Sequence, residues 1–477
     1  MTKLSSIENP RFSVVSFLRQ RGPAWFWLAM ALGLLIRVAI VTQTARFGTE
    51  IIDEQHYRQI AENILAGNGF AWGPGRPTSI RPPLYPGLLA LVWNVTGGVN
   101  LQAVRLLQIV LAALTTFLVH RTAHRLFGER SARIAAAIFW LYPSFIFFNV
   151  LILTETLFTF LLVAFVLSAV ALLTSDRNWR LSLLCGVCLG LAALTRSVLW
   201  PLPLVLCPLL VLLVRGTWRW RVTAAALVFT GYAIVIMPWA VRNTQLQRVV
   251  TVVDTMGGLN LRMGNYEYTP DDRMWDAVAL QGPRSWSWEL AVSGRGARMT
   301  EGEKDKWAQQ QALAYIREHP DTFIRRTLIK FSDFWGLERE FVAGVGRGMY
   351  APPKAVVIAA AALIGVSYPV VAVLGIVGLW TVLPQDRRAH VVMVLPFVVI
   401  MGVHTVVFGH SRYHLPLVPI LAIYAAALLT QARFTLVRLE RPQLIAAAVT
   451  CAALVLIWVR QLAFTDLERL RALLHHV

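Results

Sequence analysis

The sequence predicts an all-α polytopic membrane protein with about eleven transmembrane helices. Of its 477 residues, 56% are hydrophobic and only 15% are charged, and the mean hydropathy is +0.57. Soluble domains carry roughly 25% charged residues. Apolar runs of about 20 residues recur along the chain, and only helices satisfy their own backbone hydrogen bonds in lipid over such runs.

The first predicted span runs from about residue 24 to 45, after Lys3, Arg11, Arg19 and Arg21. Basic residues before a first span favour a cytoplasmic N-terminus. No convincing small-residue cleavage site follows the run, so we expect a retained span rather than a cleaved signal. Arg37 lies inside it, where a charge is either paired or functional, or snorkels to the interface.

Residues 46–99 form the predicted first outer loop. Residues 53–65 read as an amphipathic helix that ends at Gly67-Asn68-Gly69, and a second short apolar stretch ends near Val95. We expect both helices to lie along the membrane surface. The pair Asp53-Glu54 stands where the first span meets water, a suitable position for proton chemistry on a substrate in the bilayer; simple capping of the helix is the alternative.

Ten further spans are predicted, near residues 101–119, 132–150, 155–173, 181–197, 199–214, 222–241, 355–382, 391–409, 413–430 and 443–461. Basic loops near residues 120–133, 177–180, 215–221, 387–388 and 433–441 predict which ends are cytoplasmic. By parity, residues 242–354 are a large outer loop with an amphipathic helix from about Glu303 to Trp335, and the C-terminus lies outside. The chain thus divides into a transmembrane module (1–241), the outer loop (242–354) and a second transmembrane module (355–477).

The net charge of +19 does not indicate nucleic acid, because the Arg residues cluster in short loops between apolar runs. Part of the excess charge can meet anionic lipid headgroups or phosphates. The four cysteines, Cys185, Cys188, Cys207 and Cys451, all fall in apolar runs. They read as buried thiols rather than as a metal site, which needs further ligands nearby.

Several motifs follow in order along the chain. They are Asp53-Glu54, Ala61-Glu62-Asn63-Ile64-Leu65, Arg81-Pro82-Pro83-Leu84-Tyr85-Pro86, Thr154-Glu155-Thr156-Leu157-Phe158, Leu194-Thr195-Arg196, Pro238-Trp239-Ala240-Val241-Arg242-Asn243 and Ser411-Arg412-Tyr413-His414. This ordered set resembles the integral-membrane glycosyltransferases of superfamily C, which use polyprenyl-phosphate-linked sugars. They include the protein O-mannosyltransferases and the lipid A aminoarabinose transferases. Residues 242–354 match poorly, which leaves the acceptor open among lipid, glycan and protein.

The resemblance implies an enzyme that moves a hexosyl or pentosyl group from a polyprenyl-phosphate donor to an acceptor, with inversion. It places the reaction at the outer face of the membrane, in bacteria the periplasmic face of the inner membrane. It also implies that Asp53 is the catalytic base. Glu54 would orient the acceptor, and Glu155 is the alternative base.

Arginine suits the donor phosphate because its planar fork binds two oxygens at once. The candidates are Arg58, Arg81, Arg196, Arg242 and Arg412. The candidate substrate-binding residues within or beside the motifs are Tyr57, Tyr85, His410 and His414. His56 and His410 could bind a divalent metal together with Asp53 or Glu54, although imidazole and carboxylate ligands are not diagnostic. No cofactor is certain.

Two other functions remain as alternatives. A transporter or flippase of polyprenyl-linked sugars would place its charges in mid-membrane cavities, whereas here the acids concentrate at the predicted outer face. An O-antigen ligase or polymerase shares the many spans and the large outer loop, but bases its chemistry on Arg and His. The position of Asp53-Glu54 favours the glycosyltransferase.

Overall fold

Long apolar helices make up most of the chain in a computed structural model that describes residues 22–271, 274–435 and 440–465. Within these ranges β pairing is limited to one isolated bridge between Ala71 and Pro77, which confirms the all-α class. Eight segments of this part of the chain are long and apolar enough to cross a membrane. They are α2 (Ala24–Gln43), α5 (Leu101–Phe127), α8 (Glu155–Thr174), α11 (Trp218–Gln247), α17 (Lys354–Thr381), α18 (Arg387–Val406), η5 with α19 (Ser411–Leu417 and Val418–Thr435) and α20 (Arg441–Arg460).

The other three predicted spans are also helical, but shorter. Predicted spans 181–197 and 199–214 correspond to α9 (Trp179–Ala193) and α10 (Pro203–Leu213). Both helices pack against α11. At Gly186 a Cβ atom would lie 1.9 Å from the Val228 carbonyl oxygen, so the close approach of α9 and α11 requires glycine there.

Predicted span 132–150 was wrong as a single helix. It divides into α6 (Glu129–Trp140) and α7 (Pro143–Phe148), because Pro143 cannot donate to the preceding turn. The predicted helix 303–335 divides in the same way, into α14 (Glu301–Glu318) and α15 (Pro320–Phe334), with Pro320 at the start of the second helix. The basic N-terminal residues and the chain after residue 465 lie outside the described ranges.

Irregular backbone at 149–154 is buried beside the start of α8, where side chains satisfy it. Gln108 donates to the carbonyl oxygens of Asn149 and Leu151 at 3.0 and 2.9 Å, and Arg105 donates to that of Val150 at 2.8 Å. Non-helical backbone within a membrane protein is stable only when protein groups replace water in this way. The side chains of α5 therefore fix where α8 begins.

Arg37 in the first span is buried and paired rather than snorkelling. Its Nε donates to Asn149 Oδ1 at 2.8 Å and its Nη1 to the Trp140 carbonyl at 2.6 Å. The guanidinium also lies 3.9 Å from the centre of the Trp140 ring. These contacts join α2 to α6 and to the irregular segment before α8.

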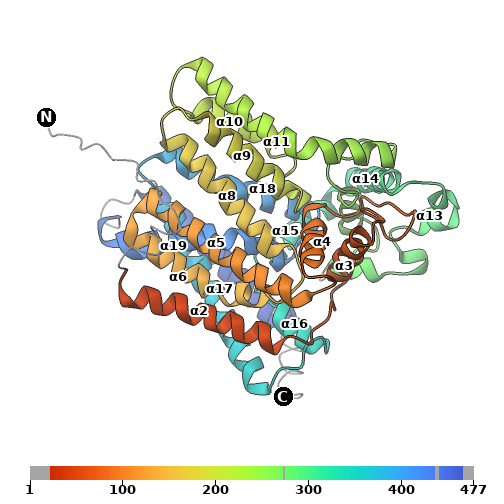
Figure 1. Cartoon of the computed structure of the whole chain (residues 1–477), viewed down its shortest axis with the longest axis horizontal. Helices are drawn as coiled ribbons and strands as arrows, with labels where there is room; N and C mark the ends of the chain where they lie inside the picture. Colours follow the sequence, from red (N-terminus) through yellow and green to blue (C-terminus); the bar gives the residue numbers. More distant parts are fainter. Residues whose placement is uncertain (1–21, 272–273, 436–439, 466–477) are drawn as a thin grey trace.

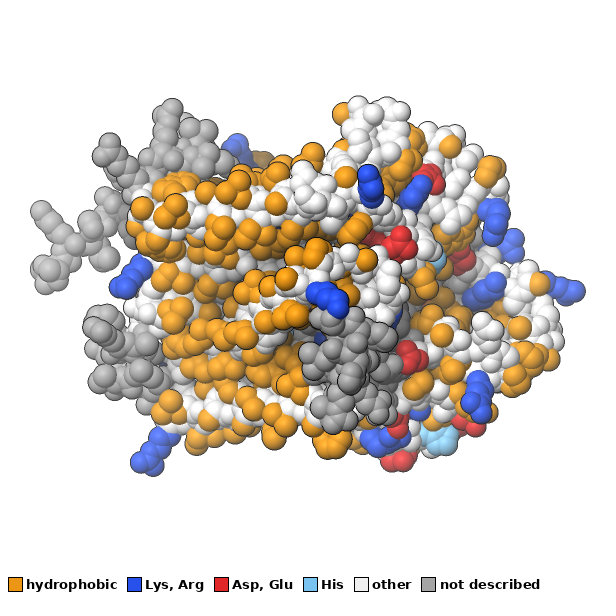
Figure 2. Space-filling model, turned by 90° about the horizontal axis from the view of Figure 1, so that it is seen from below, with side chains coloured by type: hydrophobic (Ala, Val, Ile, Leu, Met, Phe, Trp, Pro, Cys, Tyr) orange, Lys and Arg blue, Asp and Glu red, His pale blue; other side chains and the backbone are white. Residues whose placement is uncertain are grey.

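The hydrophilic elements gather at one end of the helical bundle (Figure 1). They include the first-loop helix α3 (Ile52–Leu65), against which the short apolar helix α4 (Leu84–Val95) packs, and the helices of the large hydrophilic segment: α12 (Gly257–Gly264), α13 (Trp288–Val292), α14, α15 and α16 (Glu340–Gly346). Figure 2 shows hydrophobic side chains over the body of the molecule and many of the charged ones at this same end. The first loop and the segment 242–354 therefore share one end of an integral membrane protein.

Two side chains, Glu301 and Lys330, hold the hydrophilic segment in place. Glu301 accepts hydrogen bonds from Thr78 Oγ1 at 2.7 Å and the Ser79 amide at 2.7 Å, which joins α14 to the first loop. Lys330 of α15 donates to Asn265 Oδ1 at 2.8 Å and to the Val406 carbonyl at the end of α18 at 2.9 Å. Burial lowers the pKa of Lys330 to about 7.

Candidate functional site

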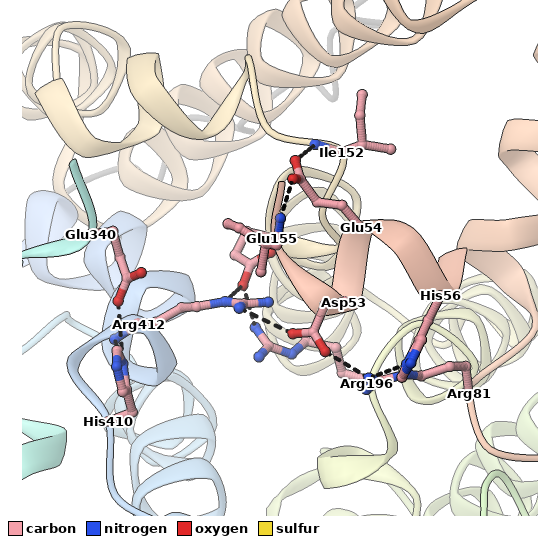
Figure 3. Close-up of polar contacts among 11 residues, drawn as sticks. Asp53, Glu54, His56, Arg81, Ile152, Glu155, Arg196, Glu340, His410 and Arg412 are labelled. Atoms are coloured by element: carbon pink, nitrogen blue, oxygen red, sulfur yellow. Dashed lines mark hydrogen bonds and ion pairs between the residues drawn. The ribbon is translucent and has the colours of Figure 1, made fainter. Parts of the chain in front are cut away.

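Asp53 stands in the first turn of α3, which a neighbouring carboxylate holds in place. Glu54 Oε2 accepts from the backbone amides of Glu50 and Ile51 at 2.9 and 3.0 Å, just before the helix. Glu54 Oε1 accepts from the Ile152 amide at 2.8 Å. The carboxylate of Glu54 thus ties α3 to the segment before α8. Its position in the first turn of α3 is favourable, because a helix N-terminus stabilises negative charge. It points away from Asp53 (Figure 3), which argues against the predicted contact with the acceptor.

Five of the predicted residues meet in one charged cluster: Asp53, Arg81, Glu155, Arg196 and Arg412 (Figure 3). Arg81 Nη2 lies 2.6 Å from Asp53 Oδ1, and Arg412 Nη1 lies 3.2 Å from Asp53 Oδ2. Arg412 Nε also donates to Glu155 Oε1, and Arg196 Nη1 lies 3.5 Å from the same oxygen. We call these five residues the carboxylate–arginine cluster.

The cluster has more cationic than anionic side chains, since three guanidinium groups surround two carboxylates. The side chains of Asp53, Arg81, Arg196 and Arg412 are each 12–16% exposed, and Glu155 is fully buried. A surplus positive charge with little access to water favours a bound anion. The residues come from α3, the approach to α4, the start of α8, the turn after α9 and η5, so the fold itself assembles the cluster.

The charge state of Asp53 follows from its neighbours. Burial raises the pKa of the Asp53 carboxyl, but the charges of Arg81 and Arg412 outweigh it and lower the pKa to about 2. Asp53 is therefore an anion at neutral pH, although a weakly basic one while both arginines face it.

Glu155 Oε2 is buried without a hydrogen-bond partner among the described residues, and so is Thr159 Oγ1 one helical turn further along α8. An unpaired buried carboxylate oxygen costs free energy of about 1–3 kcal/mol or more. Together with the guanidinium of Arg196, these atoms provide polar groups that a bound hydroxyl or water molecule would satisfy.

The predicted substrate-binding tyrosines lie beneath the cluster. Tyr57 is 5% and Tyr85 1% exposed, and their rings pack edge to face with centres 5.3 Å apart. The guanidinium of Arg81 lies 5.5 Å from the centre of the Tyr57 ring. Both tyrosines thus pack below Arg81, and a role in substrate binding stays a prediction.

Two other predicted arginines, Arg58 and Arg242, lie outside the cluster, and each has partners there. Arg58 pairs with Glu62 at 2.7 Å on the exposed side of α3. Arg242 donates to the carbonyl oxygens of Thr78 and Phe70 at 2.6 and 3.1 Å, which holds the loop before Arg81 rather than a phosphate.

His414, a predicted substrate-binding residue, is fully buried and its ring is held by protein groups. Its Nδ1 lies 2.6 Å from the Phe334 carbonyl and its Nε2 lies 3.1 Å from Glu338 Oε1. The ring also stacks on Tyr368 at 4.4 Å. Glu338 further accepts from Tyr142 at 2.7 Å, in a buried network that no sequence motif indicates.

The two candidate metal ligands stand on opposite sides of the cluster (Figure 3). Arg81 Nη2 lies 2.9 Å from His56 Nδ1, which must accept because a guanidinium only donates. Burial and the Arg81 charge lower the pKa of His56 to about 4. His410 accepts from the Arg412 amide at 3.1 Å and so orients Arg412. The described residues contain no group of three or more His, Cys, Asp and Glu side chains placed to hold a metal ion.

Asp254 is a further acidic residue near the site that the sequence analysis missed. Burial raises the pKa of its carboxyl to about 6, against the lowering effect of a hydrogen bond from Ser197. The charge of Arg81 also acts on it. Asp254 lies in an irregular part of the hydrophilic segment. The one sequence signal for it is its position directly after the apolar pair Val252-Val253.

Comparisons with known proteins bear on this arrangement. Residues 80–241 match the family model described as dolichyl-phosphate-mannose-protein mannosyltransferase. This range holds Arg81, Glu155 and Arg196 of the cluster. A search of curated protein sequences finds no match.

Two solved structures illustrate how distant the structural likenesses are. Archaeal oligosaccharyltransferase AglB from Archaeoglobus fulgidus, in complex with an inhibitory peptide and a dolichol-phosphate, is 13% identical with a TM-score of 0.47, over 91% of this chain and 55% of that one. ArnT from Cupriavidus metallidurans bound to undecaprenyl phosphate is 16% identical with a TM-score of 0.40, over 87% and 81%. The chain therefore spans about half the length of AglB. Over residues 80–241, the family model confirms the resemblance to the superfamily C glycosyltransferases.

Proposed function

We propose that the chain transfers a sugar from a polyprenyl-phosphate donor to an acceptor, with inversion, at the outer face of the membrane. The observation that carries the proposal is Arg412, which bridges Asp53 and Glu155 at one end of the membrane helices. The match of residues 80–241 to a mannosyltransferase family model supports the same reaction class. The sugar, hexosyl or pentosyl, and the acceptor, lipid, glycan or protein, are left open.

The reaction needs a base, a cationic site for the leaving group and an in-line approach. Asp53 takes the proton of an acceptor hydroxyl as its oxygen attacks the anomeric carbon. The bond from that carbon to the phosphate oxygen breaks, and polyprenyl phosphate leaves with the electron pair. A single displacement inverts the anomeric centre. General-base catalysis of this kind contributes roughly 10²–10⁴-fold.

The arginines stabilise the departing phosphate. Arg412 and Arg196 are the main candidates, since both face Glu155 and the surplus positive charge lies there. Guanidinium groups bind phosphate oxygens in pairs, and donors already fixed in place need no reorganisation as charge develops. Glu155 holds both arginines in position, and its unpaired Oε2 is available to a hydroxyl of the donor sugar.

Donor binding itself would make Asp53 a better base. The low pKa of Asp53 is due to Arg81 and Arg412. A phosphate that pairs with Arg412 supplies a negative charge close to Asp53, and a nearby like charge raises the pKa of a carboxyl. Asp53 therefore gains basicity once the donor is in place, which favours proton transfer in the complete complex.

The position of the charges favours a transferase over a flippase. Asp53, Glu155 and Arg412 all stand at the beginnings of helical elements at one end of the bundle, rather than midway along a span. An O-antigen ligase or polymerase would rely on Arg and His, whereas His414 is buried and committed to Glu338. By analogy with the family, the site faces the periplasm of a bacterial inner membrane.

Consumption of labelled donors tests the proposal. Purified protein in lipid nanodiscs is supplied with radiolabelled polyprenyl-phosphate hexoses and pentoses, together with a membrane extract as the source of acceptors. We expect one donor to be consumed and its label to appear in a new product. If no polyprenyl-phosphate sugar is consumed while the protein is folded, the proposed function is wrong.

Asp53→Asn identifies the base in the same assay. The amide keeps the size of the side chain but cannot take a proton, so we expect turnover to fall by roughly 10²-fold or more with donor binding retained. Glu155→Gln is the matched comparison, and thermal unfolding verifies that each variant is folded. Normal turnover of Asp53→Asn with a dead Glu155→Gln would assign the base to Glu155.

A further inference from the structure

A polar hollow lies beside the carboxylate–arginine cluster, on the side of His56. It has a volume of about 310 Å³ and is lined by His56, Gln59, Trp72 and Arg76. On α3, His56 lies about one helical turn after Asp53, and Gln59 lies about one turn after His56. The hollow is thus separated from Asp53 by a single turn of helix.

Trp72 is fixed in position before any ligand binds. Its indole N–H donates to Glu301 Oε1 at 3.2 Å, and its carbonyl oxygen accepts from Gln59 Nε2 at 2.8 Å. The His56 ring packs against the indole, with ring centres 4.9 Å apart and the two ring planes at 73°. A rigid aromatic ring in a polar, open hollow offers an apolar face to a ligand whose other groups are hydrophilic, and the ring loses little entropy on binding.

Two of the other lining groups, His56 and Arg76, offer a donor or a positive charge, and the Gln59 amide, whose Nε2 bonds the Trp72 carbonyl oxygen, also offers an acceptor oxygen. Because His56 Nδ1 accepts from Arg81, the ring is neutral with its proton on Nε2, which makes that atom a donor. Arg76 adds an exposed guanidinium, and the carboxylate beside the hollow, that of Glu301, already accepts from Trp72, Thr78 and the Ser79 amide. An anionic, hydroxyl-rich ligand fits this set.

We propose that the hollow is the acceptor subsite, and that the acceptor is a sugar ring that carries a phosphate. The ring lies on Trp72 and the phosphate pairs with Arg76, so that a hydroxyl of the ring reaches Asp53. This inference rests on the proposed function for the identity of the reaction. It extends it by naming the class of acceptor, a phosphorylated glycan rather than a peptide.

Ligand-observed NMR tests the hollow without turnover. The full chain in nanodiscs is mixed with glucose 6-phosphate as the probe, and saturation transfer to the ring protons is measured. We expect transfer from the parent and from Trp72→Phe, which keeps an aromatic face. Trp72→Ala should bind about tenfold more weakly, and Arg76→Gln should bring the probe down to the level of unphosphorylated glucose.

Several outcomes would overturn the inference. One is equal saturation transfer from the parent to glucose and to glucose 6-phosphate. Another is complete displacement of glucose 6-phosphate by inorganic phosphate of equal affinity, which would mean that the sugar ring adds nothing to binding. Equal binding to folded Trp72→Ala and to the parent would also reject it, as would displacement of the probe by a Ser/Thr peptide but not by phosphorylated glycans. A parent that binds the probe yet consumes no donor contradicts the proposed function alone, and a parent that consumes donor yet shows no transfer to the probe contradicts the hollow alone.

Discussion

Asp53 combines two properties that conflict in the free protein. It is surrounded by the groups that a phosphate needs, and those same groups make it a poor base, with a pKa of about 2. The conflict is resolved if the donor phosphate pairs with Arg412, because the positive charge of Arg412 then stabilises the Asp53 carboxylate less and the pKa of Asp53 rises. On this view Arg412 responds to the donor, since it contacts Asp53 and Glu155 at once.

The pH dependence of the reaction should reveal this exchange. In the free enzyme the pKa of Asp53 is about 2, so this carboxyl is ionised at every pH well above 2. Protonation of Asp53 should therefore not lower kcat/KM for the donor in that pH range. With donor bound the added negative charge raises the pKa, so the acidic limb of kcat should lie at higher pH than that of kcat/KM. Steady-state rates at fixed saturating acceptor, measured across pH with Asp53→Asn as control, check this. Coincident limbs would mean that the phosphate does not pair with Arg412.

Arg412→Lys tests the bridging geometry. An ammonium group keeps the charge but cannot donate to two carboxylates and a phosphate from one planar fork. We expect the donor KM to rise and kcat to fall, with kcat/KM lowered by roughly tenfold or more, equivalent to about 1.4 kcal/mol. The measurement is donor saturation kinetics on variants of equal thermal stability.

Arg242→Lys is the matched control for that experiment. Arg242 also stands near an outer helix end, yet it binds the Thr78 and Phe70 carbonyls, so its replacement should lower thermal stability more than it changes the donor KM. If Arg242→Lys impairs donor binding while Arg412→Lys does not, the phosphate site has been placed on the wrong arginine.

At the scale of elements, the start of α8 depends on side chains from α5. Gln108 is 1% exposed and satisfies two carbonyl groups of the irregular segment, which fixes Glu155 beneath Arg412. The three arginines therefore depend on a backbone conformation that their own helices do not determine.

Gln108→Leu should destabilise the protein. The change leaves two buried carbonyl groups unpaired, each at a cost of about 1–3 kcal/mol, so the unfolding temperature in detergent should fall clearly. Gln102→Leu, on the same helix, removes a single bond to Val41 and should have a smaller effect. Unchanged stability of Gln108→Leu together with lost activity would instead indicate that Gln108 contacts substrate.

The sequence predicted the elements well where a single local signal decides them. Hydrophobic runs located the eight described segments that are long enough to cross a membrane, and Asp53 to Leu65 was identified as a helix because its apolar residues recur at helical spacing. The prediction failed at Pro143 and Pro320, where a continuous apolar or amphipathic pattern concealed a break. Five of the charged candidates converge in the carboxylate–arginine cluster. Whether an arginine is available to a phosphate depends on whether carbonyl groups already occupy it, as they do Arg242. Those contacts come from tertiary packing, which the sequence motifs do not reveal.

At the scale of the whole molecule, the two ends of the bundle differ in chemistry. At the end opposite the cluster, Arg125 donates to Thr174 and Ser175, and Arg388 donates to the Leu173 and Leu213 carbonyls at 3.0 and 2.7 Å. These residues belong to the loops that the positive-inside pattern assigns to the cytoplasm. The contact between Glu301 and Thr78 unites the first loop with the hydrophilic segment at the other end.

Cysteine labelling should therefore separate the two ends. In a background without the four native cysteines, we expect Asn68→Cys and Lys306→Cys, both exposed near the cluster, to react with an impermeant maleimide in intact spheroplasts. Asp176→Cys and Arg219→Cys, exposed at the opposite end, should react only after permeabilisation. Because Asn68 and Lys306 stand on parts joined by Glu301, they must label alike for any orientation of the fold. Opposite labelling of that pair would contradict the fold, whereas labelling of both from the cytoplasmic side would place Asp53 in the cytoplasm and require a donor presented on the inner leaflet.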